Sequence, residues 1–247
     1  MRDYSLFYGS DRLTDSSGAR TGPPNFDVFT YVNILRPIWI TDMKVLGAYL
    51  GADIVVPFIY RRLQAGSFDD ATFGLGDILP EATLSWHLKH FDFCLGAGEW
   101  MPTGDSGVKP TTLPGLGYWA TMFTLGGTWY IDTERNWSLS ALNRYEINGQ
   151  KAETDTTTGN AWTLEWGLGR RLTKLITTGV SGYYQAKVTS DSGAHPQPLN
   201  RVAAIGPEVA FGFAAQQLWI SVRYEYEFVA ENRAQGHTAA IVLTKRL

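Results

Sequence analysis

Cysteine and catalytic sequence motifs are scarce in this chain of 247 residues. Its single cysteine, Cys94, has no partner for a disulfide or for a thiolate metal site. Because Cys94 lies in the strand-like segment FDFCLGAG, we expect an unreactive, packed thiol. No GxSxG, HExxH or phosphate-loop motif is present. These absences favour a protein without a catalytic site, a metal site or a cofactor.

Long apolar runs are also absent. No apolar run approaches the length of about 18 residues that a membrane-spanning helix needs, so helical spans are excluded. The net charge is −3 and 18% of the residues are charged, which leaves no basic surface of the kind that binds nucleic acid. This composition is still compatible with a membrane β-barrel, because barrel strands alternate apolar and polar residues and their mean hydropathy is low.

What the sequence does contain is alternation with a period of two, most clearly in Arg201–Phe213 and Leu218–Phe228. In the second segment one face carries apolar residues and the opposite face carries the charges Arg223, Glu225 and Glu227. Strands of soluble domains usually have about 5–6 residues, whereas a tilted strand that crosses a bilayer needs about 9–11. The pattern therefore predicts a long hairpin of a transmembrane barrel.

The same alternation recurs in twelve segments, which we predict to be the strands of one domain covering residues 1–247. The segments are Arg2–Arg12, Phe26–Ile40, Lys44–Tyr60, Asp77–Leu88, Phe91–Pro102, Tyr118–Asp132, Trp137–Asn148, Trp162–Leu172, Leu175–Lys187, Arg201–Phe213, Leu218–Phe228 and Ala234–Arg246. The connections after the second, fourth, sixth, eighth and tenth segments are short, such as Thr41–Met43. Those after the first, third, fifth, seventh and ninth are long and polar, such as the expected loops Arg61–Gly76 and Thr103–Gly117.

Sorting of connections by length is typical of outer-membrane barrels, which have short periplasmic turns, long extracellular loops and both termini in the periplasm. A soluble β-sandwich has no reason to sort its loops in this way. The fold class predicted is therefore all-β, a 12-stranded antiparallel transmembrane β-barrel. We expect it in the outer membrane of a Gram-negative bacterium, in contact with membrane lipids and lipopolysaccharide.

The two faces of the predicted strands differ in charge. A charge at the lipid midplane costs about 2–4 kcal/mol for Arg or Lys, so the face that collects the strand charges should line the lumen. The candidates for lumen-lining or constriction residues are Asp53, Asp77, Glu81, His87, Arg144, Glu146, Glu165, Arg171, Glu208, Arg223, Glu225, Glu227 and Arg246. Glu99 is an exception, because it shares the parity of Phe93 and Leu95; we expect it near a rim or at a bulge.

Charges of both signs in a lumen allow two interpretations. In the first, arginines and carboxylates pair with one another and hold the barrel together, as buried charges must have partners. In the second, the same side chains form a constriction that polarises a passage. Twelve strands lie between the small barrels filled by side chains and the water-filled porins, so a narrow passage is compatible with the strand number.

An enzymatic alternative rests on Ser85-Trp86-His87, because some outer-membrane barrels are lipid hydrolases that use Ser and His on one face. By parity Ser85 and His87 both face the lumen, whereas a lipid-modifying site should face the membrane or its outer rim. The other histidines lie in turns, loops or at a strand start without an evident nucleophile. The pattern does not favour an enzyme.

Several segments resemble one known family. They are YSLFYGSDRLTDSSG at the start, FGLGD at Phe73–Asp77, MPTG at Met101–Gly104, LGRRLT at Leu168–Thr173, RVAAIGPEV at Arg201–Val209 and EFVAENRAQG at Glu227–Gly236. In order and spacing they are similar to the outer-membrane family associated with meta-pathway phenol degradation. The resemblance implies a monomeric twelve-stranded channel that admits small molecules, and it brings no catalytic residues. The final residues Lys245-Arg246-Leu247 depart from the aromatic end usual in such barrels.

Three functional hypotheses follow. The first is an outer-membrane channel for passive uptake of small, hydrophobic or aromatic solutes. The second is a closed barrel with a structural or ligand-binding role, in which the long loops are the functional part. The third, least favoured, is an outer-membrane lipid hydrolase that depends on Ser85.

Overall fold

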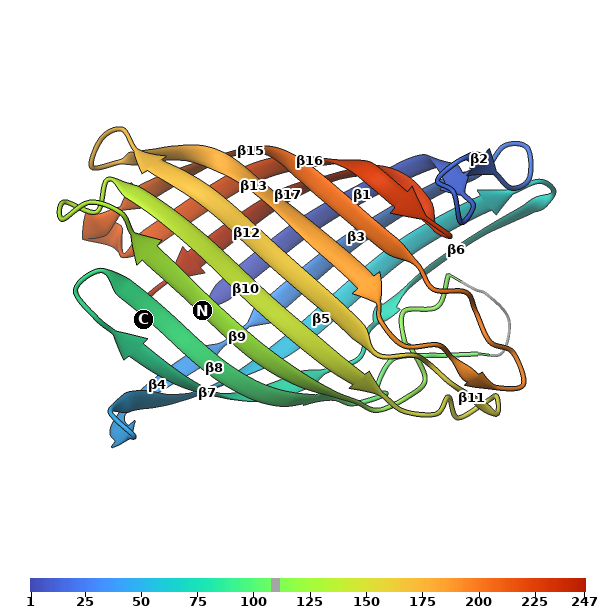
Figure 1. Ribbon diagram of the computed structural model, residues 1–247, viewed down its shortest axis with the longest axis horizontal. Helices are drawn as coiled ribbons and strands as arrows, with labels where there is room; N and C mark the ends of the chain where they lie inside the picture. The colour runs from blue at the N-terminus through green and yellow to red at the C-terminus, as the bar shows by residue number, and fades with distance from the viewer. Residues whose placement is uncertain (108–111) are drawn as a thin grey trace.

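The computed structural model describes residues 1–107 and 112–247, so part of the Thr103–Gly117 loop, residues 108–111, lies outside the described residues. Twelve long antiparallel strands form the described barrel, and it closes where β1 pairs with β17 (Figure 1). They are β1 (Arg2–Thr14), β3 (Asp27–Arg36), β5 (Ala48–Ala65), β7 (Leu79–His87), β8 (Phe91–Trp100), β9 (Ala120–Tyr130), β10 (Trp137–Asn148), β12 (Ala161–Arg171), β13 (Ile176–Lys187), β15 (Arg201–Phe213), β16 (Leu218–Glu231) and β17 (Ala234–Lys245). The predicted fold class, a 12-stranded antiparallel barrel, is confirmed.

Shorter elements extend the barrel or join its loops. They are β2 (Arg20–Thr21), β4 (Ile38–Val45), β6 (Phe68–Leu75), β11 (Thr156–Thr157), β14 (Ser192–Gly193) and the 3₁₀ helix η1 (Ala214–Gln216). Strands β4 and β6 both pair with β5, and β11 pairs with β14 across two long loops. None of the helices in the described ranges is long and apolar enough to cross a membrane.

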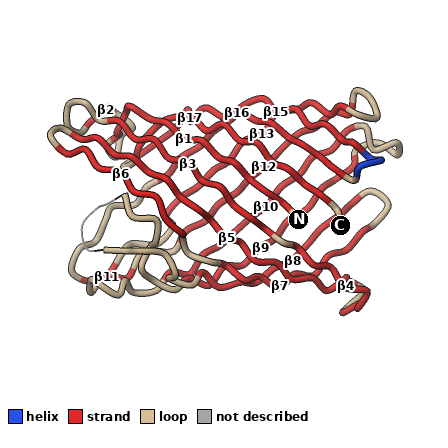
Figure 2. The backbone as a smooth tube through the Cα atoms, turned by 180° about the vertical axis from the view of Figure 1, so that it is seen from behind, coloured by secondary structure: helices blue, strands red, loops and turns tan. Residues whose placement is uncertain are grey.

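The two rims of the barrel differ as the loop lengths suggested. Short turns, η1 and the hairpin of β4 and β5 lie at one end, and β2, β6, β11 and the longer loops lie at the other (Figure 2). Both termini belong to the short-turn rim. The Lys245 N–H donates to the Met1 carbonyl at 2.9 Å, and the Arg246 N–H donates to the Gln217 carbonyl, in the turn between β15 and β16, at 3.0 Å.

The turn predicted at Thr41–Met43 is wrong. The chain continues through β4 and turns at Leu46-Gly47, between the paired residues Val45 and Ala48. Leu46 and Gly47 have φ values of 52° and 80°, as a two-residue type I′ hairpin requires. Residues 41–43 instead fall at a register shift, where Thr41 Oγ1 donates to the Leu50 carbonyl at 2.9 Å. Residues 41–43 thus form an irregularity within a long strand, and their polar composition resembles that of a turn.

The loop predicted at Arg61–Gly76 is also wrong, because most of it is a hairpin. Strand β5 continues to Ala65, turns at Gly66-Ser67 and returns as β6. The other edge of β5 pairs with β3 as far as Asp27↔Gln64, so this hairpin is part of a three-stranded extension of the wall. Strands β5 and β6 are joined by main-chain hydrogen bonds, which do not require apolar side chains. The polar composition of the segment, which is typical of a loop, is therefore compatible with a hairpin.

Alternation divides the wall into two faces. Large apolar side chains on the outer face are exposed, for example Leu125 at 53% and Phe123 at 49%. On the inner face lie a small apolar cluster of Val55, Leu79 and Met122 and many of the charged side chains. Glu99 faces outward in an unbroken strand β8, near the long-loop rim, where it accepts a hydrogen bond from Thr121 Oγ1 at 2.8 Å.

Candidate functional site in the barrel interior

Arg36 organises the buried charges on one side of the interior. From the end of β3, its Nε and Nη2 donate to the two Asp53 oxygens at 2.8 and 2.9 Å, and Nη2 also reaches Glu81 Oε2 at 2.9 Å. Asp53 and Glu81 are 5% and 4% exposed. The contact joins β3, β5 and β7 on the concave face, where side chains from strands that are not neighbours can converge. The Arg36 layer, as we call these three residues, leaves one negative charge in excess.

Glycines on β8 make room for this layer. A Cβ at Gly98 would lie 3.1 Å from Glu81 Cβ and 2.6 Å from the Pro80 carbonyl, and one at Gly96 would meet Glu81 Oε1. Thr124 on β9 donates its hydroxyl to the same Oε1 at 2.6 Å, across the strand that carries the glycines. The small residues of β8 thus let Glu81 lie flat against the wall and bond with β9.

A second group of charges lies on the opposite side of the interior. Arg144 on β10 forms an ion pair with Glu165 on β12. On β16, Arg223 Nε lies 3.8 Å from Glu225 Oε2, and Glu225 accepts a hydrogen bond from Ser181 Oγ on β13 at 2.9 Å. The Arg223 Nε has no hydrogen-bond partner among the described residues. This arginine is therefore held by charge attraction rather than by a well-formed hydrogen bond.

Glu227 is buried more deeply, at 1% exposed, and its partners are neutral. Tyr8 and Tyr183 donate their hydroxyls to its two oxygens at 3.1 and 2.8 Å, and the Gly236 N–H donates at 2.6 Å. The group ties β1, β13 and β17 to β16 near the long-loop end. Three donors satisfy the carboxylate without a cation, which supports a structural role for Glu227.

The long-loop half of the interior also contains apolar side chains. Leu79 and Met122 are 1% and 2% exposed and pack with Val55, against the partly buried Ile34 and Trp100. The Trp100 indole N–H donates to Glu146 Oε1 at 3.3 Å, so Glu146 lies beside this cluster. Apolar side chains from β3, β5, β7, β8 and β9 thus pack together in this part of the interior.

Asp77 is not on a strand but anchors a loop. It is 4% exposed, and its two oxygens accept the N–H of Gly104 at 3.0 Å and of Leu116 at 2.8 Å. Nearby, the buried Thr112 donates to Asp70 Oδ2 and bonds with Thr72, both at 2.7 Å, which fixes the loop to β6. The segments on both sides of residues 108–111 are therefore held against the long-loop end of the barrel.

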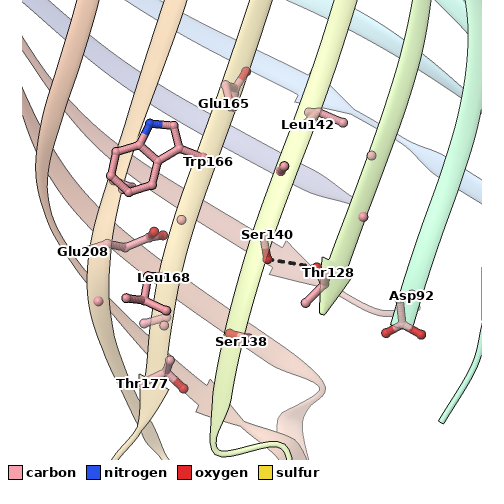
Figure 3. Close-up of a pocket in the computed structure, with 18 of the residues that line it drawn as sticks. Asp92, Thr128, Ser138, Ser140, Leu142, Glu165, Trp166, Leu168, Thr177 and Glu208 are labelled. Carbon is pink, nitrogen blue, oxygen red and sulfur yellow. Dashed lines mark hydrogen bonds between the residues drawn. The ribbon is translucent and has the colours of Figure 1, made fainter. Parts of the chain in front are cut away.

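The short-turn half of the interior is hollow. A cavity of about 520 Å³ opens there (Figure 3), and its wall is formed by strands β7 to β16. Hydroxyl groups and glycines make up much of the lining, including Ser85, Thr128, Ser138, Ser140, Thr177, Ser181, Gly126, Gly167 and Gly179. Four predicted lumen residues also line it: His87, Glu165, Glu208 and Arg223. The chamber, as we call this cavity, could hold a small solute.

Ser85 and His87 both lie on the chamber wall, as their parity predicts. His87 Nδ1 is 3.0 Å from Asp92 Oδ1, and Asp92 also accepts the Tyr130 hydroxyl at 2.7 Å. No hydrogen bond joins Ser85 to His87 in the described part of the chain. A base oriented by a carboxylate is present, but the serine that it would have to activate is not in contact with it.

Two of the predicted lumen residues lie elsewhere. Arg171 is exposed at the short-turn rim, where it donates to the Glu134 carbonyl and to Asn136 in the turn between β9 and β10. Arg246 follows the last residue of β17 and is exposed. His87 is also close to this rim, and its side chain is 55% exposed. Arg171, Arg246 and His87 lie at or just beyond the ends of their strands. Alternation alone does not show where a strand ends, so it could not place them at the rim.

Sequence reasoning missed Arg36 and the two tyrosines that hold Glu227. Arg36 is followed by Pro37, and an arginine in an irregular part of the predicted strand Phe26–Ile40 is not assigned to either face by alternation. The parity of Tyr8, which it shares with Ser10 and Arg12, could have placed it inside. Within residues 1–107 and 112–247, no group of three or more His, Cys, Asp or Glu side chains could hold a metal ion.

Comparison with known proteins identifies the family. Residues 10–242 match the model of the family described as the MetA-pathway of phenol degradation, which is nearly the whole chain. The chain belongs to this family. No curated protein matches the sequence. The resemblance seen in the sequence motifs is thereby confirmed.

Solved structures with the same architecture include outer-membrane proteins. The COG4313 outer membrane channel from Pseudomonas putida F1 superposes with a TM-score of 0.82 at 12% identity, covering 98% of this chain and 93% of that one. A Pseudomonas aeruginosa FadL homologue gives 0.51 at 11% identity, covering 98% and 88%. The β domain of the Bordetella autotransporter BrkA gives 0.57 at 12% identity, covering 99% and 98%. At these identities the likeness concerns the fold.

Proposed function

We propose that this family member is a channel of the Gram-negative outer membrane through which small, hydrophobic or aromatic solutes enter passively. The observation that carries the proposal is the chamber of about 520 Å³ inside a closed barrel. A monomer that is embedded in lipid and lipopolysaccharide fits the exposed apolar outer face, because a membrane would cover those side chains. The family description and the structure titled as an outer membrane channel support the same role.

The chamber and the packed half of the interior define a route with one narrow part. A solute that enters from the long-loop rim meets the Arg36 layer and the cluster of Val55, Leu79 and Met122 before it reaches the chamber. We infer that this level is the constriction and that Glu81 and Asp53 belong to it. The Ser85 hydroxyl would act as part of the lining, so the role we propose is not enzymatic.

Single-channel recording in planar bilayers tests the proposal. Purified barrel should give discrete, reproducible conductance steps. The matched control is a heat-denatured sample of the same preparation, which should give none. A folded protein that produces no step at any applied voltage would count against a channel.

A second function, that of a closed ligand-binding barrel, is favoured by the apolar packing around Leu79 and Met122. In that case the chamber would retain a ligand but not pass it. Equilibrium binding of an aromatic probe such as toluene, without conductance and without uptake into liposomes, would select this alternative.

A further inference from the structure

In the described part of the chain, one carboxylate of the chamber wall, that of Glu208, has no ion-pair partner. Asp92 is bound by His87 and Tyr130, and Glu165 is bound by Arg144. Among the described residues, no side chain donates a hydrogen bond to the carboxylate of Glu208 or forms an ion pair with it. The side-chain hydrogen bond that reaches Glu208 goes to its main-chain carbonyl, from Thr178 Oγ1 at 3.4 Å.

The strands on either side explain why Glu208 is left alone. In the register of the barrel, its neighbour on β13 is Gly179, which has no side chain. Its neighbour on β16 is Arg223, which has the charge to pair with it. The Arg223 guanidinium is instead directed to Glu225, 3.8 Å away, whose side chain is only 4% exposed. The cation therefore stabilises the more deeply buried of two competing carboxylates.

An unpaired carboxylate in a narrow lumen has a predictable effect on what enters. The chamber wall carries three carboxylates, those of Asp92, Glu165 and Glu208, and one arginine, Arg223. An excess of negative charge between low-dielectric walls focuses the field and enriches cations. Acidic side chains that line a pore set cation selectivity in channels. Hydroxyl oxygens such as those of Ser138, Ser140 and Thr128 line the same chamber and can replace part of the water around a cation.

We propose that Glu208 makes the chamber selective for cations, so that potassium and small protonated amines pass in preference to anions. The inference deepens the proposed channel function and rests on it. It assigns a specificity-determining residue and a charge class of solute, organic ammonium over organic carboxylate. Arg223 opposes this effect. If its guanidinium moves from Glu225 toward Glu208, it neutralises the Glu208 charge and lowers the cation selectivity.

The test is the reversal potential of the full chain in planar bilayers under a KCl gradient. Wild type should prefer K⁺ over Cl⁻ by at least about threefold, because clefts lined by one sign of charge enrich counter-ions by about tenfold or more and Arg223 offsets part of the negative charge here. Glu208→Gln should bring the ratio close to one. Arg223→Gln should raise it above that of wild type, because two carboxylates lose their shared cation. The matched control is Glu99→Gln, which removes a carboxylate from the outer face and should leave the ratio unchanged.

The outcomes separate this inference from the channel proposal. Folding of each variant is checked by heat-modifiable migration on gels. Conductance with equal or anion-favouring permeability in wild type would overturn the cation selectivity while leaving the channel in place. Cation preference that survives in Glu208→Gln would overturn the role of this residue. Absence of conductance in the folded wild type would overturn both proposals.

A second readout uses organic solutes of matched size. Liposomes that contain the barrel should take up benzylammonium faster than benzoate, and the difference should shrink in Glu208→Gln. Equal rates for the two ions in wild type would contradict the proposed amine preference.

Discussion

At the scale of single residues, Arg36 is the cation that binds two buried carboxylates of the interior at once. Its guanidinium is the shared donor to two carboxylates that are nearly inaccessible to solvent, Asp53 and Glu81. Thr124 can bond with Glu81, but Asp53 has no second charged partner among the described residues. A buried ion pair adds little compared with an apolar pair, yet removing one partner leaves the other charge stranded. The wall of β3, β5 and β7 therefore depends on this arginine.

Replacing Arg36 should destabilise the barrel strongly. Arg36→Met keeps much of the side-chain volume but leaves Asp53 buried without a cation, which should lower the free energy of unfolding by about 3–5 kcal/mol. The measurement is a denaturant titration in detergent micelles, followed by tryptophan fluorescence. The matched control is Arg62→Gln, because the Arg62–Asp69 pair is about half exposed and solvent screens it, so its loss should change the free energy of unfolding far less than the loss of Arg36. Similar small losses in both variants would contradict the importance of burial.

Alternation was sufficient to place some charged residues on the face that the structure buries, as with Glu225 and Glu227. It could not give their partners. Ser181 and Tyr183 lie two strands away from these glutamates, and that contact depends on how the closed barrel staggers its strands. That the buried charges form a constriction stays a prediction. Ion pairs that hold the barrel together and charges that line a solute passage would involve the same side chains.

At the scale of elements, the long loops are tied to one another rather than free. Strand β11 in one long loop pairs with β14 in the next long loop. Asp191 joins the second of these loops to the first and to the end of β13. Its carboxylate accepts Lys187 Nζ at 2.7 Å and the N–H groups of Gly159 and Gln197, both at 2.8 Å. The sequence showed two polar loops; it could not show that they pair, because neither has the alternation of a long strand.

The Asp191 contacts should make this loop pair sensitive to acid. Burial alone would raise the pKa of Asp191, but the hydrogen bonds from Lys187 and from the two backbone N–H groups outweigh it and hold the pKa below its ordinary value. A carboxyl whose pKa is lower in the folded state contributes stability above its unfolded pKa of about 3.9, and that stability is lost as the pH falls through the folded pKa. We expect the amide protection of Gly159 and Gln197, measured by NMR exchange in micelles, to be retained at pH 6 and to fall only as the pH drops below about 4.

The control for this loop prediction is Asp191→Asn. The amide keeps one acceptor oxygen and does not titrate in this range, so protection should start lower and change little with pH. A variant whose protection falls with pH as steeply as that of wild type would assign the effect to another group.

At the scale of the whole molecule, twelve alternating segments and the sorting of their connections were enough to predict the barrel. The distribution of space inside it was not predictable in this way. The open volume at each level along the barrel axis depends on whether the inward residues there are small, such as Gly and Ser, or large, such as Leu and Met. Which residues share a level depends on the stagger of the strands. Glycines and serines gather at the level of the chamber, whereas Leu79 and Met122 meet near the long-loop end.

This uneven filling makes a prediction for conductance. If the apolar cluster is the narrowest level, Met122→Ala should raise the single-channel conductance, because it removes a large side chain that is 2% exposed on the inner face. The truncation should also lower the free energy of unfolding by about 2–5 kcal/mol, the usual cost of a core cavity. Leu125→Ala on the same strand is the matched control, since Leu125 faces outward and is 53% exposed. Its conductance should equal that of wild type. Equal conductance in all three proteins would place the narrowest level elsewhere and remove the cluster of Val55, Leu79 and Met122 from the route.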